Sequence, residues 1–512
     1  MKIQKIPEMT SEYGKTRQNG MESALPALED VRKMTAGTDC HRVPVYRELP
    51  ADMVTPIMVL RKLKKVSEHC FILESAEAQE RWGRYTFLGY DPTLEIRCRA
   101  GKMKIGAITV ETKDPASYIR QIMKEHKAVR IPELPPFAGG LVGYFSYDYL
   151  KYAEPTLDLD AKDTEEFEDI DLMLFENVIV FDNVKQKIIL ISNMNVDEGE
   201  AGYHRAERNL AEMRDLILYG KPAEDVPGKL TSDMTPYFDK EAYCEMIRKA
   251  KDHIHEGDIF QIVLSNRLEG SFEGTLLNTY RVLRTVNPSP YMFYLSGTDV
   301  ETAGASPETL VRLEDGVLHT FPLAGTRRRG KTPEEDRALE EELLADEKEL
   351  AEHNMLVDLG RNDLGRLSEF GSVEVEHYHQ ILRFSHVMHI GSTVRGNIRD
   401  GLDALDTIGA VLPAGTLSGA PKIRACQLIN ELEDNRRGIY GGAIGYIDFT
   451  GNMDTCIGIR LAYKKNGKVF VRSGAGIVAD SVPEKEYEEC INKAAAVVRA
   501  LEEADGYDFA DR

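Results

Sequence analysis

The sequence has no long apolar run, no basic block and no CxxC cysteine pair, and each absence excludes a class of protein. Since no run of about eighteen apolar residues occurs, we expect no membrane-spanning helix. The formal net charge of −21 argues against nucleic acid and anionic membrane surfaces as partners. The seven cysteines are scattered and odd in number, which is typical of a protein in the reducing cytoplasm.

The chain is expected to form two folded regions. Residues 1–25 lack the apolar core of a signal peptide and are predicted to be a disordered polar tail. Segment 220–238 has the composition of a linker, so we place the two regions at 26–219 and 239–505. Helices and strands alternate irregularly, which favours an α+β fold with large, mostly antiparallel sheets and flanking helices.

Two pairs of glutamates, each spaced three residues apart on an expected helix, form the first candidate site. Glu349 and Glu352 lie on one helix, and Glu486 and Glu489 lie on the last helix of the chain. Either pair alone is better explained by solvated helix charge. Two pairs that both turn toward the interior would instead form the oxygen-rich site that Mg²⁺ prefers beside an anionic substrate.

Each of these helices has a sequence signal for its start. Thr332 and Glu335 match a capping box, as do Ser481 and Glu484. We therefore expect one long helix over 332–363 and a second one that begins at Ser481.

A second candidate site is an anion-binding corner beside the hairpin that Asn466-Gly467 predicts. In a two-residue register Arg460 lies opposite Ser473, next to Gly474-Ala475-Gly476, whose amides have almost no side-chain cover. A guanidinium beside such amides suits a carboxylate, while a structural arginine at a flexible bend is the alternative. Tyr440, expected on the preceding strand, would lie near the same corner.

Two further motifs are weaker. GTLSGAPK (415–422) lacks the order of a phosphate loop, but it offers Thr416 and loop amides to an anion. The histidine pairs at 377/379 and 386/389 have no third ligand at zinc spacing, so His389 is either a proton-transfer group or a structural histidine. The residues alone thus predict an enzyme with a Mg²⁺ site and an anion corner that acts on a small carboxylated substrate.

Eight ordered motifs resemble the chorismate-utilising enzymes, over roughly 26–503. They are SPETL (306–310), PLAGTRRRG (322–330), DEKELAEHNMLVDLGRND (346–363), HVMH (386–389), GTLSGAPK (415–422), YGGAIGY (440–446), IGIRLAY (457–463) and SGAGIVADSVPEKEYEECINKA (473–494). The resemblance implies a two-part α+β fold with an N-terminal regulatory region and a C-terminal catalytic region.

The resemblance also implies roles for particular residues. Glu352 and Glu489 would ligate Mg²⁺, and Glu349 and Glu486 would complete the ring of carboxylates. The positions implied for chorismate binding are Gly325, Thr326, Tyr440, Arg460, Gly474, Ala475 and Gly476, and those implied for catalysis include Glu308, His389 and Thr416. His389 is the candidate that assists pyruvate elimination.

The implied reaction is the attack of ammonia on chorismate, followed by elimination of pyruvate and release of anthranilate. No cysteine lies on a glycine-flanked elbow, so ammonia would be free or come from a separate glutamine amidotransferase subunit. Aminodeoxychorismate synthesis is the alternative, opposed by Ala324 where those enzymes carry lysine. Gln261, where isochorismate synthases carry a lysine that activates water, opposes that reaction. A catalytically silent sensor would not need two carboxylate pairs.

The resemblance finally implies feedback inhibition by tryptophan, the end product of the pathway. Tryptophan would bind at Ser75 and at Pro290, Tyr291 and Met292, with Met292 and Phe293 as walls for the indole. The alternative is that both segments are ordinary strand ends.

Overall fold

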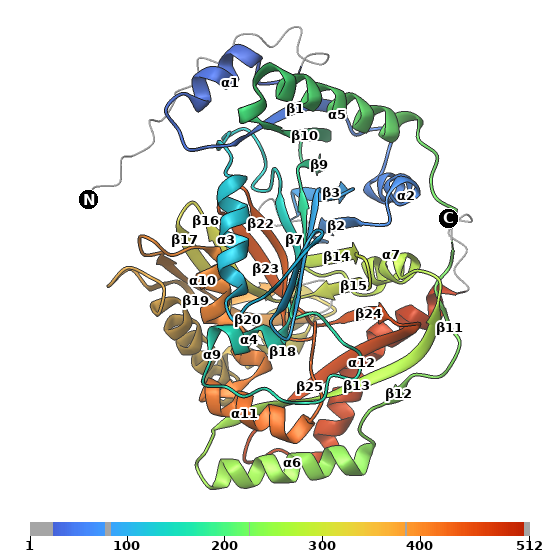
Figure 1. Cartoon of the computed structure of the whole chain (residues 1–512). Helices are drawn as coiled ribbons and strands as arrows, with labels where there is room; N and C mark the ends of the chain where they lie inside the picture. Colours follow the sequence, from blue (N-terminus) through green and yellow to red (C-terminus); the bar gives the residue numbers. More distant parts are fainter. Residues whose placement is uncertain (1–23, 77–82, 225, 384–386, 506–512) are drawn as a thin grey trace.

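The structure, a computed structural model, describes residues 24–76, 83–224, 226–383 and 387–505. Two large antiparallel sheets form its centre, and helices cover their outer faces (Figure 1). The predicted α+β class is confirmed. The expected tail lies outside the described residues except for its end, where Leu25 forms a β-bridge with Tyr46.

The first sheet combines thirteen strands of the described chain. Its main path runs in the order β1 (Arg42–Pro50), β10 (Lys187–Asn195), β9 (Asn177–Asp182), β3 (Tyr85–Tyr90), β2 (Cys70–Glu74), β14 (Tyr291–Ser296), β15 (Glu301–Ser306), β24 (Leu461–Lys465), β25 (Lys468–Ile477), β13 (Gln261–Glu273) and β11 (Lys229–Leu230), while β12 (Thr235–Pro236) and β21 (Gly419–Ala420) also pair with β13.

The second sheet combines twelve strands of the same described ranges. Its main path runs in the order β18 (Leu323–Arg328), β20 (Val387–Asn397), β17 (Val317–Thr320), β16 (Thr309–Glu314), β23 (Met453–Ile457), β22 (Ala443–Asp448), β7 (Gly140–Phe145), β8 (Ile170–Phe175), β4 (Leu94–Arg99), β5 (Lys102–Ile105) and β6 (Ile108–Glu111), while β19 (Glu374–Arg383) pairs with β20.

The α-helices are α1 (Leu28–Thr35), α2 (Pro56–Val66), α3 (Pro115–Glu125), α4 (Leu150–Ala153), α5 (Gly199–Tyr219), α6 (Lys240–His255), α7 (Leu277–Val286), α8 (Pro333–Ala345), α9 (Glu347–Gly365), α10 (Ala404–Val411), α11 (Lys422–Glu433) and α12 (Pro483–Ala504). Short 3₁₀ turns lie at Tyr147–Tyr149, Val196–Glu198 and Gly415–Leu417. Within the described ranges, no helix is long and apolar enough to cross a membrane.

Both sheets combine strands from both halves of the chain. In the first sheet β2 pairs with β14, and in the second β7 pairs with β22. The expected linker 220–238 itself supplies β11 and β12. Both sheets therefore continue across the expected boundary, and the division into a regulatory and a catalytic region stays a prediction.

An aromatic core joins the two sheets. Phe71 of the first sheet meets Phe175 of the second edge to face, with ring centroids 4.7 Å apart. Phe87 and Tyr446 form a second such contact at 6.0 Å. Large rings bury much apolar area with few rotamers, so the sheets hold one another in a fixed orientation.

The acidic segment expected as one helix over 332–363 is two helices. Asp346 ends α8 and caps α9, since its carboxylate accepts hydrogen bonds from the backbone N–H groups of Lys348 and Glu349. An aspartate cap stabilises a new helix start, and this favours a break. Thr332 caps α8 as predicted, by accepting a hydrogen bond from Glu335 N at 3.2 Å.

The capping box expected at Ser481 is wrong. Helix α12 begins at Pro483, and Val482 occupies the cap position without a side-chain hydrogen bond. The Ser481 hydroxyl accepts instead from Val478 N at 3.1 Å, which stabilises the turn between β25 and α12.

The Asn466-Gly467 hairpin is confirmed, but its extent differs from the expectation. Lys465 pairs with Lys468, and the pairing of β24 with β25 ends at Ala462 and Val471. Arg460 therefore does not face Ser473 across the ladder; its φ is 53°, which turns the chain away. Tyr440 also precedes β22 rather than lying on a strand.

Candidate active site

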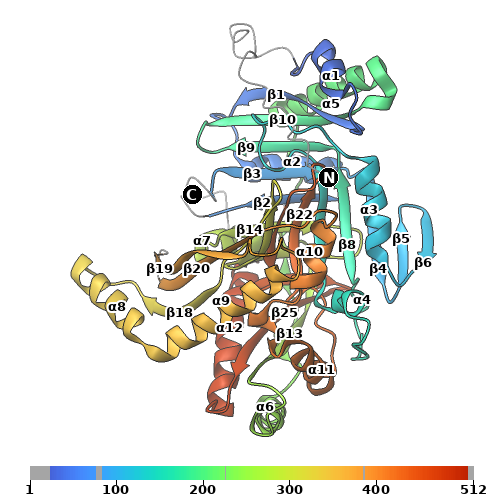
Figure 2. The same cartoon turned by 90° about the vertical axis from the view of Figure 1, so that its left-hand side faces the viewer.

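The four predicted glutamates lie on α9 and α12, both labelled in Figure 2, and the charge of Glu489 on α12 acts on Glu352 of α9. Burial and the charge of Glu349 raise the pKa of Glu352, and Glu489 of α12 adds to this effect. Burial likewise raises the pKa of Glu486, with a further contribution from Glu489. Carboxylates that repel one another in this way attract a cation.

Mg²⁺ fits the chemistry of these glutamates, because it prefers hard oxygen ligands. Two of the four glutamates also bind basic side chains of the protein. Glu489 forms an ion pair with Lys493 at 2.7 Å, and Glu349 Oε1 lies 3.5 Å from Arg327 Nη1. Lysine and arginine thus compensate part of the charge here, and Mg²⁺ binding stays a prediction.

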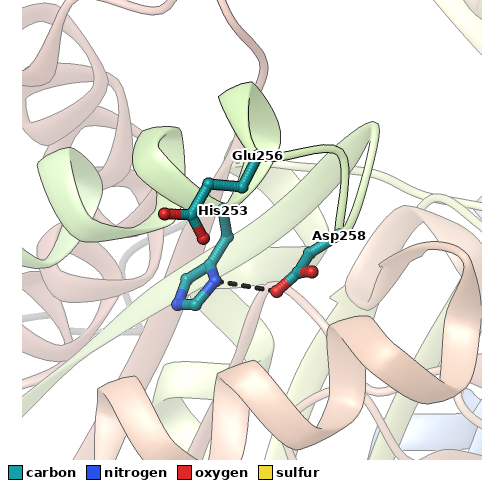
Figure 3. Close-up of side chains that lie close together, drawn as sticks. All are labelled: His253, Glu256 and Asp258. Atoms are coloured by element: carbon teal, nitrogen blue, oxygen red, sulfur yellow. Dashed lines mark hydrogen bonds and ion pairs between the residues drawn. The ribbon is translucent and has the colours of Figure 1, made fainter.

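Another cluster has metal-like spacing, but it lies at the end of α6. Among the described residues, only His253, Glu256 and Asp258 place three candidate ligand atoms within 4.8 Å of one another (Figure 3). His253 Nδ1 lies 3.0 Å from Asp258 Oδ2, and Arg424 donates to the same oxygen at 2.7 Å. Because the Arg424 guanidinium already occupies that oxygen and would compete with a metal ion, we interpret the three residues as stabilising the turn after α6.

The anion corner is built around Arg460. Burial lowers the pKa of its guanidinium, whose nitrogen atoms have no hydrogen-bond or ion-pair partner among the described residues. Together with Glu489 and Lys493 it lines a hollow of about 420 Å³. A desolvated guanidinium in a hollow is a receptor for a carboxylate of a ligand.

The glycine segment forms one edge of this corner. On one side Gly474 pairs with Ser265 and Gly476 with Val263 of β13. On the other side the ladder with β24 has already ended at Val471, so within the described chain no strand covers the segment there. Gly474 and Ala475 are buried, and Gly476 is the exposed residue of the three. Tyr440 is adjacent, since a Cβ on Gly474 would lie 2.9 Å from its hydroxyl oxygen.

His389 contacts the predicted substrate-binding residues Gly325 and Thr326, which lie on β18 where its pairing with β20 is irregular. Its Nδ1 lies 3.0 Å from the Gly325 carbonyl oxygen and 3.0 Å from Thr326 Oγ1. Because a carbonyl only accepts, Nδ1 carries the proton and Nε2 is the basic nitrogen. Burial lowers the pKa of His389, so the ring is neutral at pH 7. Gly325 has φ 66°, and a Cβ there would lie 3.3 Å from Glu349 Oε2.

Glu308 and Thr416 form the third part of the site. Thr416 Oγ1 donates to Glu308 Oε1 at 3.0 Å, across a small cavity of about 50 Å³ that both residues line. Burial raises the pKa of Glu308 to about 7, and the hydrogen bond from Thr416 opposes that rise. A carboxyl group that is half protonated near neutral pH is suited to donate a proton.

Three further residues of the sequence analysis have defined places in the fold. Lys422 of GTLSGAPK forms an ion pair with Asp363 at 2.9 Å, so it is engaged within the fold. Ala324 lies on β18, and Gln261 lies beside the glycine edge, 3.2 Å from a Cβ built on Gly476. His386 lies outside the described residues.

The two segments predicted to bind tryptophan are neighbours. Met292 pairs with Glu74 across β14 and β2, and Ala76 N donates to Ser289 O at 3.1 Å, so Ser75 and Pro290 lie at one end of this pair. One detail of the prediction is wrong. Successive strand residues face opposite sides, and Met292 and Phe293 belong to different cores, so they cannot both be walls for one indole.

Sequence reasoning missed a buried ion network of Glu433, Arg437 and Arg472 behind the corner. Its only signal was the charge-rich run ELEDNRR (431–437), which is more often a solvated surface.

Comparison with known proteins identifies the family of the chain. The model of the chorismate binding enzyme family matches residues 68–499, so the chain belongs to that family of enzymes. It is 47% identical to anthranilate synthase component 1 of Aquifex aeolicus, over 94% of this chain and 98% of that protein. It is 45% identical to the protein of the same name from Acetivibrio thermocellus, over 94% of this chain and 99% of that one. Within the family the chain belongs to the anthranilate synthase component 1 proteins.

A solved structure supports the same placement. Anthranilate synthase component I from Streptococcus pneumoniae is 39% identical and superposes with a TM-score of 0.72, over 83% of this chain and 93% of that one.

Proposed function

We propose that this enzyme converts chorismate and ammonia to anthranilate and pyruvate. The observation that supports this best is Arg460, a desolvated guanidinium beside an uncovered strand edge, because chorismate is a dicarboxylate. Arg460 and the amides of Gly474 to Gly476 hold one carboxylate, while Tyr440 and the Gly325-Thr326 segment of β18 orient the ring.

The proton transfers follow from the two groups beside the ring. Glu308, protonated in part near pH 7, donates a proton to the leaving hydroxyl group as ammonia adds to the ring. Neutral His389 accepts a proton at Nε2 during the elimination of pyruvate. Thr416 orients the Glu308 carboxyl group through its hydrogen bond.

Glu352 and Glu489 would hold Mg²⁺, with Glu349 and Glu486 beside them. The ion would act as a Lewis acid and as a template for the substrate carboxylate. The raised pKa values of Glu352 and Glu486 support this, because a nearby cation would relieve the repulsion that contributes to them.

The ammonia comes from a glutamine amidotransferase subunit, component II, or from solution. Six of the seven cysteines are buried, and burial raises the pKa of thiols such as Cys70 and Cys456. Buried protonated thiols are poor nucleophiles, which supports a separate glutaminase. The relatives named component 1 also support a second component.

Tryptophan inhibits the enzyme at Ser75, Pro290, Tyr291 and Met292. Tyr291 supports a link to the active site, because its hydroxyl lies 3.0 Å from Thr309 Oγ1, next to Glu308. A ligand that shifts Tyr291 would therefore change chorismate binding, and chorismate would change its affinity equally.

One assay tests the proposal. The purified chain is mixed with chorismate, Mg²⁺ and ammonium, and anthranilate fluorescence is followed together with pyruvate release. Both products are expected in equal amounts. Consumption of chorismate without pyruvate would favour aminodeoxychorismate as the product, and no consumption would refute both reactions.

A further inference from the structure

A buried carboxylate lies behind the anion corner, at the end of α11. Glu433 is 1% exposed and binds two buried arginines. Arg437 donates to both of its oxygens, at 2.5 and 3.0 Å, and Arg472 donates to Oε2 at 3.0 Å. Burial opposes ionisation here, but the two guanidinium groups hold the pKa of Glu433 below its usual value, so the carboxylate is charged.

Arg437 connects this carboxylate to two segments of the site. Its Nη1 donates to the Leu417 carbonyl at 2.6 Å, directly after Thr416, and its Nη2 donates to the Val263 carbonyl of β13 at 2.7 Å. Its guanidinium also lies 5.8 Å from the ring centre of Tyr440. A single planar group thus sets the separation of the Thr416 turn and β13.

Arg472 connects the same carboxylate to the glycine edge. It lies on β25, two residues before Gly474, and its Nη1 donates to the Arg436 carbonyl at 2.7 Å. Ser265 completes the network, because its backbone N–H donates to Glu433 Oε1 at 2.7 Å. Ser265 is also the residue of β13 that pairs with Gly474 of β25 in the antiparallel sheet. The turn that leads to Tyr440 is thereby held against β25.

We propose that Glu433, Arg437 and Arg472 are positioning residues that fix the Thr416 turn, the Tyr440 turn and the glycine edge relative to one another. The proposal rests on the function proposed above. The three side chains are enclosed by protein and do not line the 420 Å³ hollow, so they act through the segments they hold. Bidentate bonds to charged groups fix direction as well as distance, which apolar packing does not.

The first test replaces Arg437 by lysine. Lysine keeps the charge but cannot reach Glu433, Leu417 and Val263 together in the planar geometry of a guanidinium. We expect kcat/KM for chorismate, at saturating ammonium, to fall roughly 10- to 100-fold, because small displacements of catalytic groups have effects of that size. The loss should appear in kcat as well as in KM.

The matched control is Arg42→Lys. Arg42 is also buried and forms an ion pair with Glu176 at 2.8 Å, but it lies on β1, at the opposite end of the molecule from α11 (Figure 1). Thermal unfolding is measured for both variants. If both lose similar stability and only Arg437→Lys loses activity, the positioning role is supported; equal activity losses would overturn it.

A double-mutant cycle separates positioning from simple structural damage. Thr416→Val is measured alone and together with Arg437→Lys. If Arg437 acts by placing Thr416, Arg437→Lys should lower kcat/KM less in the Thr416→Val variant than it does in the wild type. Fully additive losses would contradict the proposal. If Arg437→Lys does not fold, Ser265→Ala replaces it in the cycle. This change removes a single hydroxyl group, which accepts from Arg472 Nε at 2.9 Å and donates to the Glu433 carboxylate at 3.0 Å.

Failure of the proposed reaction can be distinguished from failure of the positioning role. If the wild-type chain binds chorismate but makes no anthranilate, the proposed reaction fails. Chorismate affinity, measured by calorimetry on the same variants, then tests the network, and unchanged affinity in Arg437→Lys would overturn it.

Discussion

Replacing Thr416 by valine tests the proposed proton donor through the direction of a pKa change. Burial raises the pKa of Glu308 from 4.5 to about 7, while the Thr416 hydroxyl lowers it. At pH 7 a carboxyl group with a pKa of 4.5 is protonated in about 0.3% of molecules, and one with a pKa of 7 in about 50%. The environment of Glu308 therefore enlarges the population of the acid by roughly 150-fold at neutral pH.

The assay is the pH profile of kcat/KM for chorismate between pH 5 and 9. Because the protonated form is required, activity should fall as pH rises through about 7. Thr416→Val removes a hydrogen bond that favours the carboxylate, so this fall should move to higher pH, although the maximal rate should decrease as the carboxyl group loses its orientation.

Glu308→Gln is the control for the assignment. Glutamine does not titrate, so the fall near pH 7 should disappear and only a low rate should remain. A carboxyl group whose pKa is raised by folding destabilises the protein increasingly as pH rises from 4.5 to about 7, and the effect then stays constant. Glu308→Gln should therefore raise the thermal unfolding temperature more at pH 8 than at pH 5. A fall near pH 7 that persists in Glu308→Gln, or one that moves to lower pH in Thr416→Val, would refute the reasoning.

The proposed function makes three further predictions, two at the active site and one at the segments proposed to bind tryptophan. Glu352→Gln or Glu489→Gln should lower activity roughly 100-fold at low Mg²⁺ without unfolding the chain, and full activity of either variant there would contradict the metal assignment. His389→Ala should slow pyruvate elimination more than amination, so that chromatography of the reaction detects an aminated intermediate; finding only unreacted chorismate would count against this division of roles. Ser75→Leu should abolish inhibition by tryptophan with nearly unchanged uninhibited turnover, and calorimetry that detects no tryptophan binding to the wild type would exclude the site.

Local patterns in the sequence determined several elements of this protein. The Asn466-Gly467 pair predicts the β24–β25 hairpin, because its two residues tolerate the positive φ that such a turn requires. The i,i+3 spacing of Glu349 with Glu352, and of Glu486 with Glu489, places each pair on one side of its helix. These features depend on residues close in the chain, and the ordered motifs likewise identify the family.

The tertiary structure alone decided how these parts meet. Strand order joins β2 to β14 and β7 to β22 across more than a hundred residues, which no local pattern encodes. The helix break at Asp346 was missed because its cap competes with an otherwise continuous helical pattern. The ion network of Glu433 looks like surface charge in sequence, and only the packing of α11 against β13 and β25 buries it. Burial also raises the pKa of Glu308, because desolvation depends on neighbours that fold around a residue rather than on those beside it in the chain.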